Sequence, residues 1–351
     1  MTEITPITMK VSHDLGGLRL DQALQKMLPE YSRSRLQAWI KEGLVTVNAE
    51  VVTAKSKVWG GENIVIQPQQ IPGDNAFKAE DIALDIVYED DYLLVVNKPA
   101  GMVVHPAAGN WEGTLLNALL HHTPQVKDLP RAGIVHRLDK DTSGLLVVAK
   151  TLEAQTSLVR QLQARTVKRE YRAIVWGQVW RNGVVDQPIG RHPHARTKMA
   201  VNRNGKPAVT RYEVLERFAV HTYLRCMLET GRTHQIRVHM QFMKAPMVGD
   251  PVYGYRGIVP IRMMTPQLRE AVDGFKRQAL HAIKLGLIHP HTQEPMEWQI
   301  ELPQDMKSLL EAMRLENVPV EEEFEFAYHE SDEDDLDEDA EYLESEDEDL
   351  E

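Results

Sequence analysis

The segment GIVHRLDKDTSGLLVVAK, residues 133–150, places a short polar and charged loop between two apolar stretches with the composition of β-strands. A loop at the ends of rigid strands is where a sheet commonly presents its reactive side chains. The sequence therefore predicts that strands hold this loop on both sides. It also marks the loop as a candidate functional site.

Within this loop, His136, Arg137, Asp139 and Asp141 stand close together along the chain. An arginine beside a carboxylate favours the ionised form, which leaves the carboxylate available as a nucleophile or a base. The local pattern leaves a second interpretation open, in which the loop is a surface turn held by ion pairs. A pair of carboxylates also suggests a glycosidase, which would use both of them.

The rest of the chain divides at changes of composition into three parts, which we predict to be residues 1–75, 76–318 and 319–351. Residues 67–75, QPQQIPGDN, read as a linker because proline, glycine and asparagine favour turns. The first part combines two helical patterns with short strand-like runs, and the second alternates strand-like runs with a few helical ones. The helices are expected at 19–28, 34–40 and 114–121, and the strands of the first part at 44–48 and 64–66.

Formal charge separates the third part from the other two. The chain of 351 residues carries −12, but 19 of its 52 acidic residues lie in 321–351, where there is no lysine or arginine. The preceding residues therefore hold 33 acidic residues against 40 basic ones, a formal charge of +7. A basic body is expected of a protein that binds nucleic acid, although it also serves solubility alone. The acidic run reads as a solvated, disordered tail.

Cysteine content and hydropathy bear on the compartment. The single cysteine, Cys226, cannot form an intrachain disulfide. No apolar run approaches the length that spans a bilayer, and the N-terminus lacks the pattern of a signal peptide. We therefore expect a cytoplasmic protein that does not associate with membranes.

The first part resembles the S4 RNA-binding module in its succession RLDQAL, SRSR and GLVTVN. This resemblance implies that Arg33, Arg35 and Lys41 line one face of the second helix and meet RNA phosphates. Typical modules continue with asparagine, glycine and a basic residue at the following turn. Here the turn is Asn48-Ala49-Glu50, which contributes less positive charge than usual.

The loop sequence HRLDKDTSG resembles the signature of the RluA-type RNA pseudouridine synthases, and the resemblance extends over about residues 15–315. It implies an α+β catalytic domain with a mixed, largely antiparallel sheet and a central cleft. It also implies that Asp139 is the one indispensable catalytic residue. Arg137 would displace and replace the target base, and His136 would bind substrate beside it. Asp141 is expected to be structural, accepting backbone amides of the tight turn.

Two further segments resemble signatures of the same family, KREYRAIVWG at 168–177 and LETGRTHQIRVHM at 228–240. The first implies that Tyr171 stacks on the uracil and takes part in proton transfer. A flipped pyrimidine needs such an aromatic wall. The second implies that Arg237 pairs with Asp139 and that Arg232 holds a loop or a phosphate.

The implied reaction isomerises uridine without cofactor or metal, and the implied partner is large-subunit ribosomal RNA. One member type of the family shares further segments such as YSRSR and RQALHA, which implies the helix 69 hairpin as substrate. A different rRNA or tRNA site, and a non-catalytic rRNA-binding assembly factor, remain alternatives. A metal hydrolase is disfavoured because His234 and His239, read as part of a strand, would point to opposite faces.

Overall fold

The computed structural model describes residues 6–28, 31, 33–67, 77–106, 110–195, 198–254 and 264–316, without the side chains of residues 33–35. The predicted tail at 319–351 and most of the predicted linker lie outside these ranges. None of the helices within them is long and apolar enough to cross a membrane.

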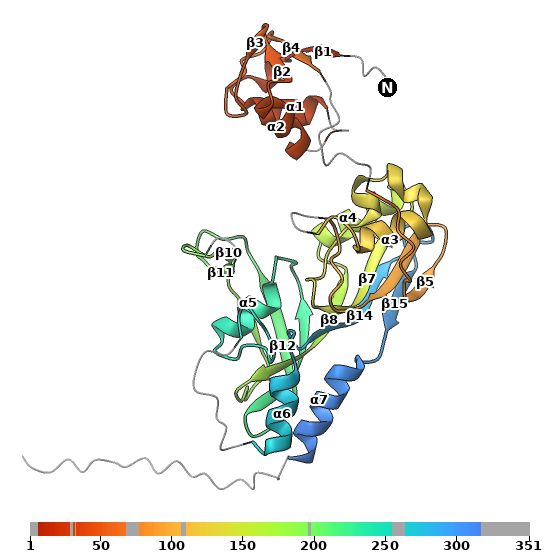
Figure 1. Cartoon of the computed structure of the whole chain (residues 1–351), viewed down its shortest axis with the longest axis vertical. Coiled ribbons are helices and arrows are strands. Elements are labelled where there is room, and N and C mark those ends of the chain that lie inside the picture. Colours follow the sequence, from red (N-terminus) through yellow and green to blue (C-terminus); the bar gives the residue numbers. More distant parts are fainter. Residues whose placement is uncertain are drawn as a thin grey trace, which may run out of the picture.

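The N-terminal module contains two helices and a small antiparallel sheet (Figure 1). Helices α1 (Leu20–Met27) and α2 (Arg33–Lys41) pack on a sheet ordered β1-β4-β2-β3. The expected helices and the strands β2 (Val45–Val47) and β4 (Asn63–Ile66) are confirmed, and β3 (Glu50–Val51) closes a hairpin with β2. The sequence interpretation missed β1 (Ile7–Lys10), which pairs with β4 along its whole length.

A nine-stranded sheet forms the body of the second part, with the strand order β5-β6-β7-β14-β8-β13-β12-β9 and β15 paired to β14. All of these pairings are antiparallel except that between β7 and β14, so the predicted mixed, largely antiparallel sheet is confirmed. The strands are β5 (Ile86–Glu89), β6 (Leu93–Lys98), β7 (Ser143–Ala149), β8 (Lys168–Trp176), β9 (Gly183–Asp186), β12 (Val209–Arg217), β13 (His221–Leu228), β14 (Leu280–Ile288) and β15 (Pro295–Gln299).

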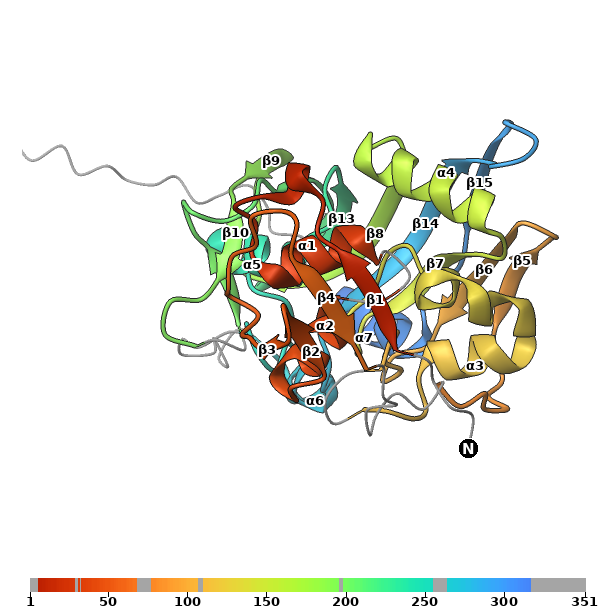
Figure 2. The same ribbon diagram turned by 90° about the horizontal axis from the view of Figure 1, so that it is seen from above.

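Both faces of the β6–β7 region are covered, which explains the continuous apolar runs in these strands. Alternate residues of β6 belong to two different cores: Leu94 packs with α3 (Leu115–His122), whereas Leu93 packs with α4 (Leu152–Gln163). Figure 2 shows α3 and α4 on the two sides of these strands. Helix α3 matches the predicted helical segment, and Thr114 caps its N-terminus.

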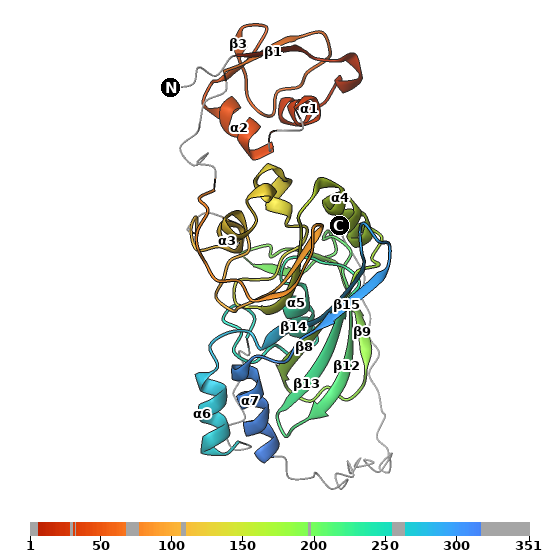
Figure 3. The same cartoon turned by 90° about the vertical axis from the view of Figure 1, so that its right-hand side faces the viewer.

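Strands β8 and β13 pack against α6 (Pro266–Gly274) and α7 (Gln304–Leu315), which lie side by side in Figures 1 and 3. They share a core with Trp176, Phe218 and Tyr223 of the neighbouring strands and loops. A separate two-stranded hairpin, β10 (Ile189–Arg191) with β11 (Met199–Val201), contacts helix α5 (Gln235–Phe242).

Two local predictions were wrong. Residues 133–135 form no strand: the 3₁₀ helix Pro130–Gly133 precedes the loop, and only Ile134 makes an isolated bridge to Val148. The segment after His234 is helix α5 and not a strand, so His234 and His239 do not lie on opposite faces of a strand. Both ring nitrogens of His239 form hydrogen bonds, one with the Thr210 hydroxyl and one with the carbonyl of Gln187.

The glycine of the DTSG turn is required by the sheet. Gly144 has a φ of +114° and faces Ala282 of β14, where a Cβ atom would lie 2.2 Å from the Ala282 carbonyl oxygen. Ala282 is also the register partner of Tyr171 on its other side. The parallel β7–β14 pair therefore brings the Asp139 loop beside the strand that carries Tyr171.

Candidate active site

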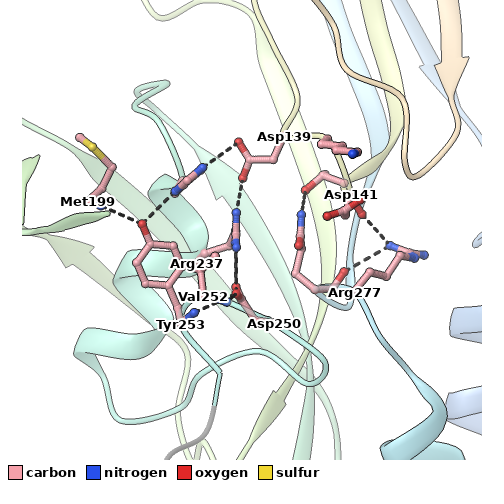
Figure 4. Close-up of polar contacts among 12 residues, drawn as sticks. Asp139, Asp141, Met199, Arg237, Asp250, Val252, Tyr253 and Arg277 are labelled. Atoms are coloured by element: carbon pink, nitrogen blue, oxygen red, sulfur yellow. Dashed lines mark hydrogen bonds and ion pairs between the residues drawn. The ribbon is translucent and has the colours of Figure 1, made fainter. Parts of the chain in front are cut away.

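Asp139 and Arg237, 98 residues apart in sequence, form an ion pair. Arg237 Nη1 donates to Asp139 Oδ2 at 3.0 Å (Figure 4), and the side chains of Arg237 and Asp139 are 5% and 15% exposed. This charge-assisted hydrogen bond fixes the orientation of the Asp139 carboxylate. Arg237 lies on α5 and Asp139 in the loop before β7, so two separate elements fix this geometry.

A second carboxylate holds Arg237 from behind. Asp250 accepts from Arg237 Nε at 2.7 Å and Nη2 at 2.8 Å, and also from the backbone amides of Val252 and Tyr253. Burial alone would lower the pKa of Arg237, but the bonds and charges of Asp250 and then Asp139 raise it. Burial alone would raise the pKa of Asp250, but the hydrogen bonds and charge of Arg237 outweigh burial, so the pKa of Asp250 is lowered. Arg237 is therefore a fixed cation whose remaining Nη1 is directed at Asp139.

His234 and Tyr253 approach Asp139 from the other side. The amide of Met199 donates to the Tyr253 hydroxyl oxygen at 2.8 Å, and that hydroxyl lies 2.8 Å from His234 Nδ1. His234 Nε2 is 3.8 Å from Asp139 Oδ1. Burial lowers the pKa of His234, so the ring is neutral near pH 7. With Tyr253 donating to Nδ1, the imidazole hydrogen sits on Nε2 and faces Asp139.

The sequence interpretation missed this His234–Tyr253 pair. It considered His234 only as a metal ligand and assigned no catalytic role to Tyr253. His234 lies within the family-like segment 228–240, but its contact with Tyr253 joins residues 19 apart in sequence, and His234 has a left-handed backbone with φ of 57°.

Tyr171 forms the wall of the recess that contains Asp139. Its side chain is 5% exposed and lies on β8, and Leu138, Leu228 and Ile236 line the same recess. Burial raises the pKa of the Tyr171 phenol, which keeps the hydroxyl protonated near pH 7. The recess therefore combines one carboxylate with an aromatic and aliphatic surface suited to a planar base.

The three residues predicted to bind substrate nearby differ in their surroundings. Arg137 is exposed and lines a larger cavity of about 790 Å³ beside the recess. His136 accepts the amide hydrogen of Val147 on Nε2, and burial lowers its pKa to about 3, so it is a neutral acceptor fixed to β7. Arg232 lines both hollows and donates from Nε to the carbonyl of Pro207.

The prediction that the Asp141 carboxylate accepts backbone amides of the turn was wrong. In the described part of the chain its carboxylate accepts no backbone amide; the Asp141 carbonyl instead accepts from Arg277. The turn is closed by the Thr142 amide, which donates to the carbonyl of Asp139 at 3.0 Å. The buried ammonium of Lys98 supports the loop through the carbonyl of Lys140 at 3.0 Å. These side chains supply hydrogen-bond donors to carbonyls of the turn, and buried carbonyls need such partners.

The predicted RNA-binding residues of the N-terminal module are placed only in part. Arg33 and Arg35 lie within α2, but their side chains are outside the described set. Lys41 is the last residue of α2 and is exposed.

Known protein families match the first two parts of the chain. The S4 domain family matches residues 18–64, and the RNA pseudouridylate synthase family matches residues 92–242. A solved structure, human RNA pseudouridylate synthase domain containing 4, superposes with a TM-score of 0.52 at 25% identity, covering 65% of this chain and 92% of that one. The fold and these matches define an RNA pseudouridine synthase with an N-terminal S4 domain.

Relatives identify the branch of this class. Ribosomal large subunit pseudouridine synthase D of Nitrosomonas europaea is 56% identical over 313 residues, which is 89% of each chain. The protein of that name from Escherichia coli K12 is 53% identical over 315 residues, covering 90% of this chain and 96% of the relative. The chain belongs to the family of ribosomal large subunit pseudouridine synthases D.

Proposed function

We propose that this enzyme converts uridine to pseudouridine in large-subunit ribosomal RNA, in the hairpin of helix 69, with Asp139 as its single catalytic carboxylate and without a cofactor. The observation that carries the proposal is the carboxylate of Asp139, held by Arg237 at 3.0 Å beside the buried ring of Tyr171. The names of the relatives support large-subunit rRNA as the substrate.

The reaction breaks the bond between N1 of uracil and C1′ of the ribose, turns the base, and joins C5 to C1′. The proton lost from C5 is balanced by one gained at N1, so substrate and product are isomers. Asp139 either attacks C1′ or C6, or removes a ribose proton. Arg237 keeps its charge throughout because Asp250 holds its other nitrogens.

Tyr171 has two tasks in this proposal. Its ring bounds the recess and limits where the detached uracil can move, and its protonated hydroxyl is available for proton transfer. Apolar neighbours exclude water from the cleaved intermediate, which would otherwise be hydrolysed. Arg137, exposed beside the recess, occupies the place in the RNA stack that the flipped uridine leaves.

The test uses large-subunit rRNA labelled with [5-³H]uridine and incubated with the purified chain. Each pseudouridine formed releases one tritium from C5, and chemical mapping of the product locates the modified positions. We expect tritium release with modification confined to the helix 69 hairpin. Release with modification elsewhere would contradict the substrate, and no release from any rRNA would contradict the enzymatic proposal.

A further inference from the structure

Arg169 is a buried cation for which the described chain supplies no counter-ion. It lies on β8, the residue is 8% exposed, and its guanidinium makes no hydrogen bond or ion pair with any described residue. Its Nε is buried without a partner. Neighbouring Arg172 and Arg225, by contrast, both pair with Glu170. An unpaired buried charge is costly, so a fold that keeps one has a use for it.

The surrounding loop makes room for this guanidinium. A Cβ atom added to Gly231 would lie 2.7 Å from Arg169 Nη1, so a side chain at that position would displace the arginine. The backbone of Gly231 is not in the left-handed region, which leaves this close approach as the observed reason for glycine there. The loop before α5 is thus shaped around the Arg169 head group.

The guanidinium borders the cavity of about 790 Å³ beside the Asp139 recess. Among the described residues, five arginines line this cavity, and the one lining carboxylate, Glu229, is already paired with Arg211 at 2.6 Å. His136 in the wall is neutral. The cavity therefore has a strong excess of positive charge and suits an anionic ligand. The lining arginines are Arg131, Arg137, Arg165, Arg169 and Arg232.

The position of Arg169 relative to Tyr171 indicates which anion the cavity would bind. Side chains two residues apart on a strand share a face and stand about 7 Å apart. Tyr171 bounds the recess, Arg169 bounds the cavity, and Arg232 lines both. A base against Tyr171 would therefore leave the phosphate of the same or an adjacent nucleotide within reach of Arg169.

We propose that Arg169 binds the RNA backbone phosphate adjacent to the target uridine and anchors the flipped nucleotide before Asp139 acts. The planar guanidinium fork matches two phosphate oxygens, which an ammonium cannot do. The inference rests on the proposed function for the identity of the RNA, but its test is a binding measurement that does not require catalysis.

The experiment compares Arg169→Gln with Arg160→Gln, a control that removes an exposed arginine of α4 outside the cavity. Affinity for a helix 69 hairpin is measured from about 50 to 200 mM salt. A hairpin with a neutral methylphosphonate at each linkage flanking the target uridine is measured alongside. We expect Arg169→Gln to weaken binding roughly tenfold and to reduce the salt slope by about 1 relative to the control.

One methylphosphonate should weaken the wild type but not Arg169→Gln, because the variant has already lost that contact. Equal affinity and salt slope in variant and control would overturn the proposal. A methylphosphonate effect that is the same in wild type and variant would also overturn it. Inorganic phosphate is also added as a competitor. If it competes with the hairpin only when Arg169 is present, while the methylphosphonates do not change the affinity of the wild type, the site binds a free anion and the RNA assignment is wrong.

Gly231→Ala provides an independent variant that leaves residue 169 an arginine. Its methyl group would push the guanidinium aside, so the same losses should appear with thermal unfolding near that of the wild type. Arg169→Lys, which retains charge without the fork, should recover the salt slope but only part of the affinity. Failure of tritium release in wild type, with these binding effects intact, would sink the proposed function and not the anion site.

Discussion

Asp139 depends on neighbours that come from two distant segments, one with His234 and Arg237 and one with Asp250. Arg237 binds one carboxylate oxygen at 3.0 Å, and His234 approaches the other at 3.8 Å. Asp250 in turn keeps Arg237 in place when Asp139 changes, because it holds two guanidinium nitrogens by itself. A substitution at Asp139 therefore tests chemistry with little disturbance to the fold.

Asp139→Asn should abolish pseudouridine formation while leaving RNA affinity within a few-fold of wild type. The side chains have nearly the same shape, and only the nucleophilic charge is lost. Tritium release and hairpin binding measure the two effects separately. Activity above about a hundredth of wild type would show that the carboxylate is not essential. Asp141→Asn is the matched control and should keep much of its activity, whereas a two-carboxylate hydrolase would lose it.

Tyr253→Phe should slow catalysis about tenfold with little change in KM, because it removes the hydroxyl between the Met199 amide and His234 Nδ1. Loss of the donor at Nδ1 also favours imidazolium, so the acid limb of the pH–rate profile should move to higher pH. A merely structural role would not move that limb.

Tyr88→Phe is the control for a lost tyrosine hydroxyl. Tyr88 donates to Asp90 at 2.7 Å on β5, away from the recess, and its removal should leave the profile unchanged. A profile for Tyr253→Phe that coincides with wild type would show that the contact with His234 does not affect Asp139.

At the level of secondary-structure elements, the β2–β3 hairpin contains a strained turn. Asn48 and Ala49 both have left-handed backbones, with φ of 50° and 67°. This is the conformation of a two-residue turn that favours asparagine followed by glycine. Ala49 therefore carries a conformational cost. The module tolerates this cost because β2 also pairs with β4 on the edge opposite β3.

Ala49→Gly should stabilise this hairpin by about 1 kcal/mol, since glycine adopts the left-handed region without a Cβ clash. Native-state hydrogen exchange of the Val47 and Glu50 amides, which flank the turn and pair across the hairpin, gives the local free energy of opening. Ala38→Gly, within helix α2, is the opposite control and should lower stability by a similar amount. Faster exchange in Ala49→Gly would contradict the strain assigned to the turn.

The N-terminal module as a unit should contribute affinity and not chemistry. Deletion of residues 1–75 is expected to weaken rRNA binding and to make its salt dependence shallower, because phosphate contacts are lost. Single-turnover tritium release at saturating RNA should stay near the wild-type rate. Unchanged affinity and salt slope would show that the module does not contact RNA.

Across the whole molecule, buried neutral histidines make stability depend on pH. Burial lowers the pKa of His136 to about 3 and those of His221 and His281 to about 4. Between their ordinary value of 6.5 and these folded values, the unfolded chain binds more protons than the folded one. The free energy of unfolding must therefore fall as the pH drops from about 6.5 toward 4.

His221→Phe should reduce this acid loss. His221 is fully buried beside Trp176, with ring centroids 4.4 Å apart, and neither ring nitrogen has a partner among the described residues. Phenylalanine keeps the ring packing and removes the titration. Relative to wild type, the variant should gain about 2 kcal/mol more at pH 4.5 than at pH 7.5 in urea unfolding. His194→Phe, at an exposed site, should show no such difference.

The sequence by itself determined the class of the protein and the segments that meet at its site. Its local patterns gave α3 with its Thr114 cap and the two helices of the N-terminal module, since capping and helical spacing act within a few residues. The alternation of Ile236, Val238 and Met240 misled: it matches a strand, but α5 is buried nearly all round, so apolar spacing there carries no helical period.

Only the tertiary structure decided how the Asp139–Arg237 pair is supported and where charge is left unpaired. The His234–Tyr253 contact, the Asp250 brace on Arg237 and the lone guanidinium of Arg169 all depend on which side chains of remote segments come within about 3 Å. Sequence motifs record residue types, whereas hydrogen bonds and burial depend on distances between segments. The parallel β7–β14 pair likewise brings the Asp139 loop beside Tyr171 of β8, and no local pattern encodes it.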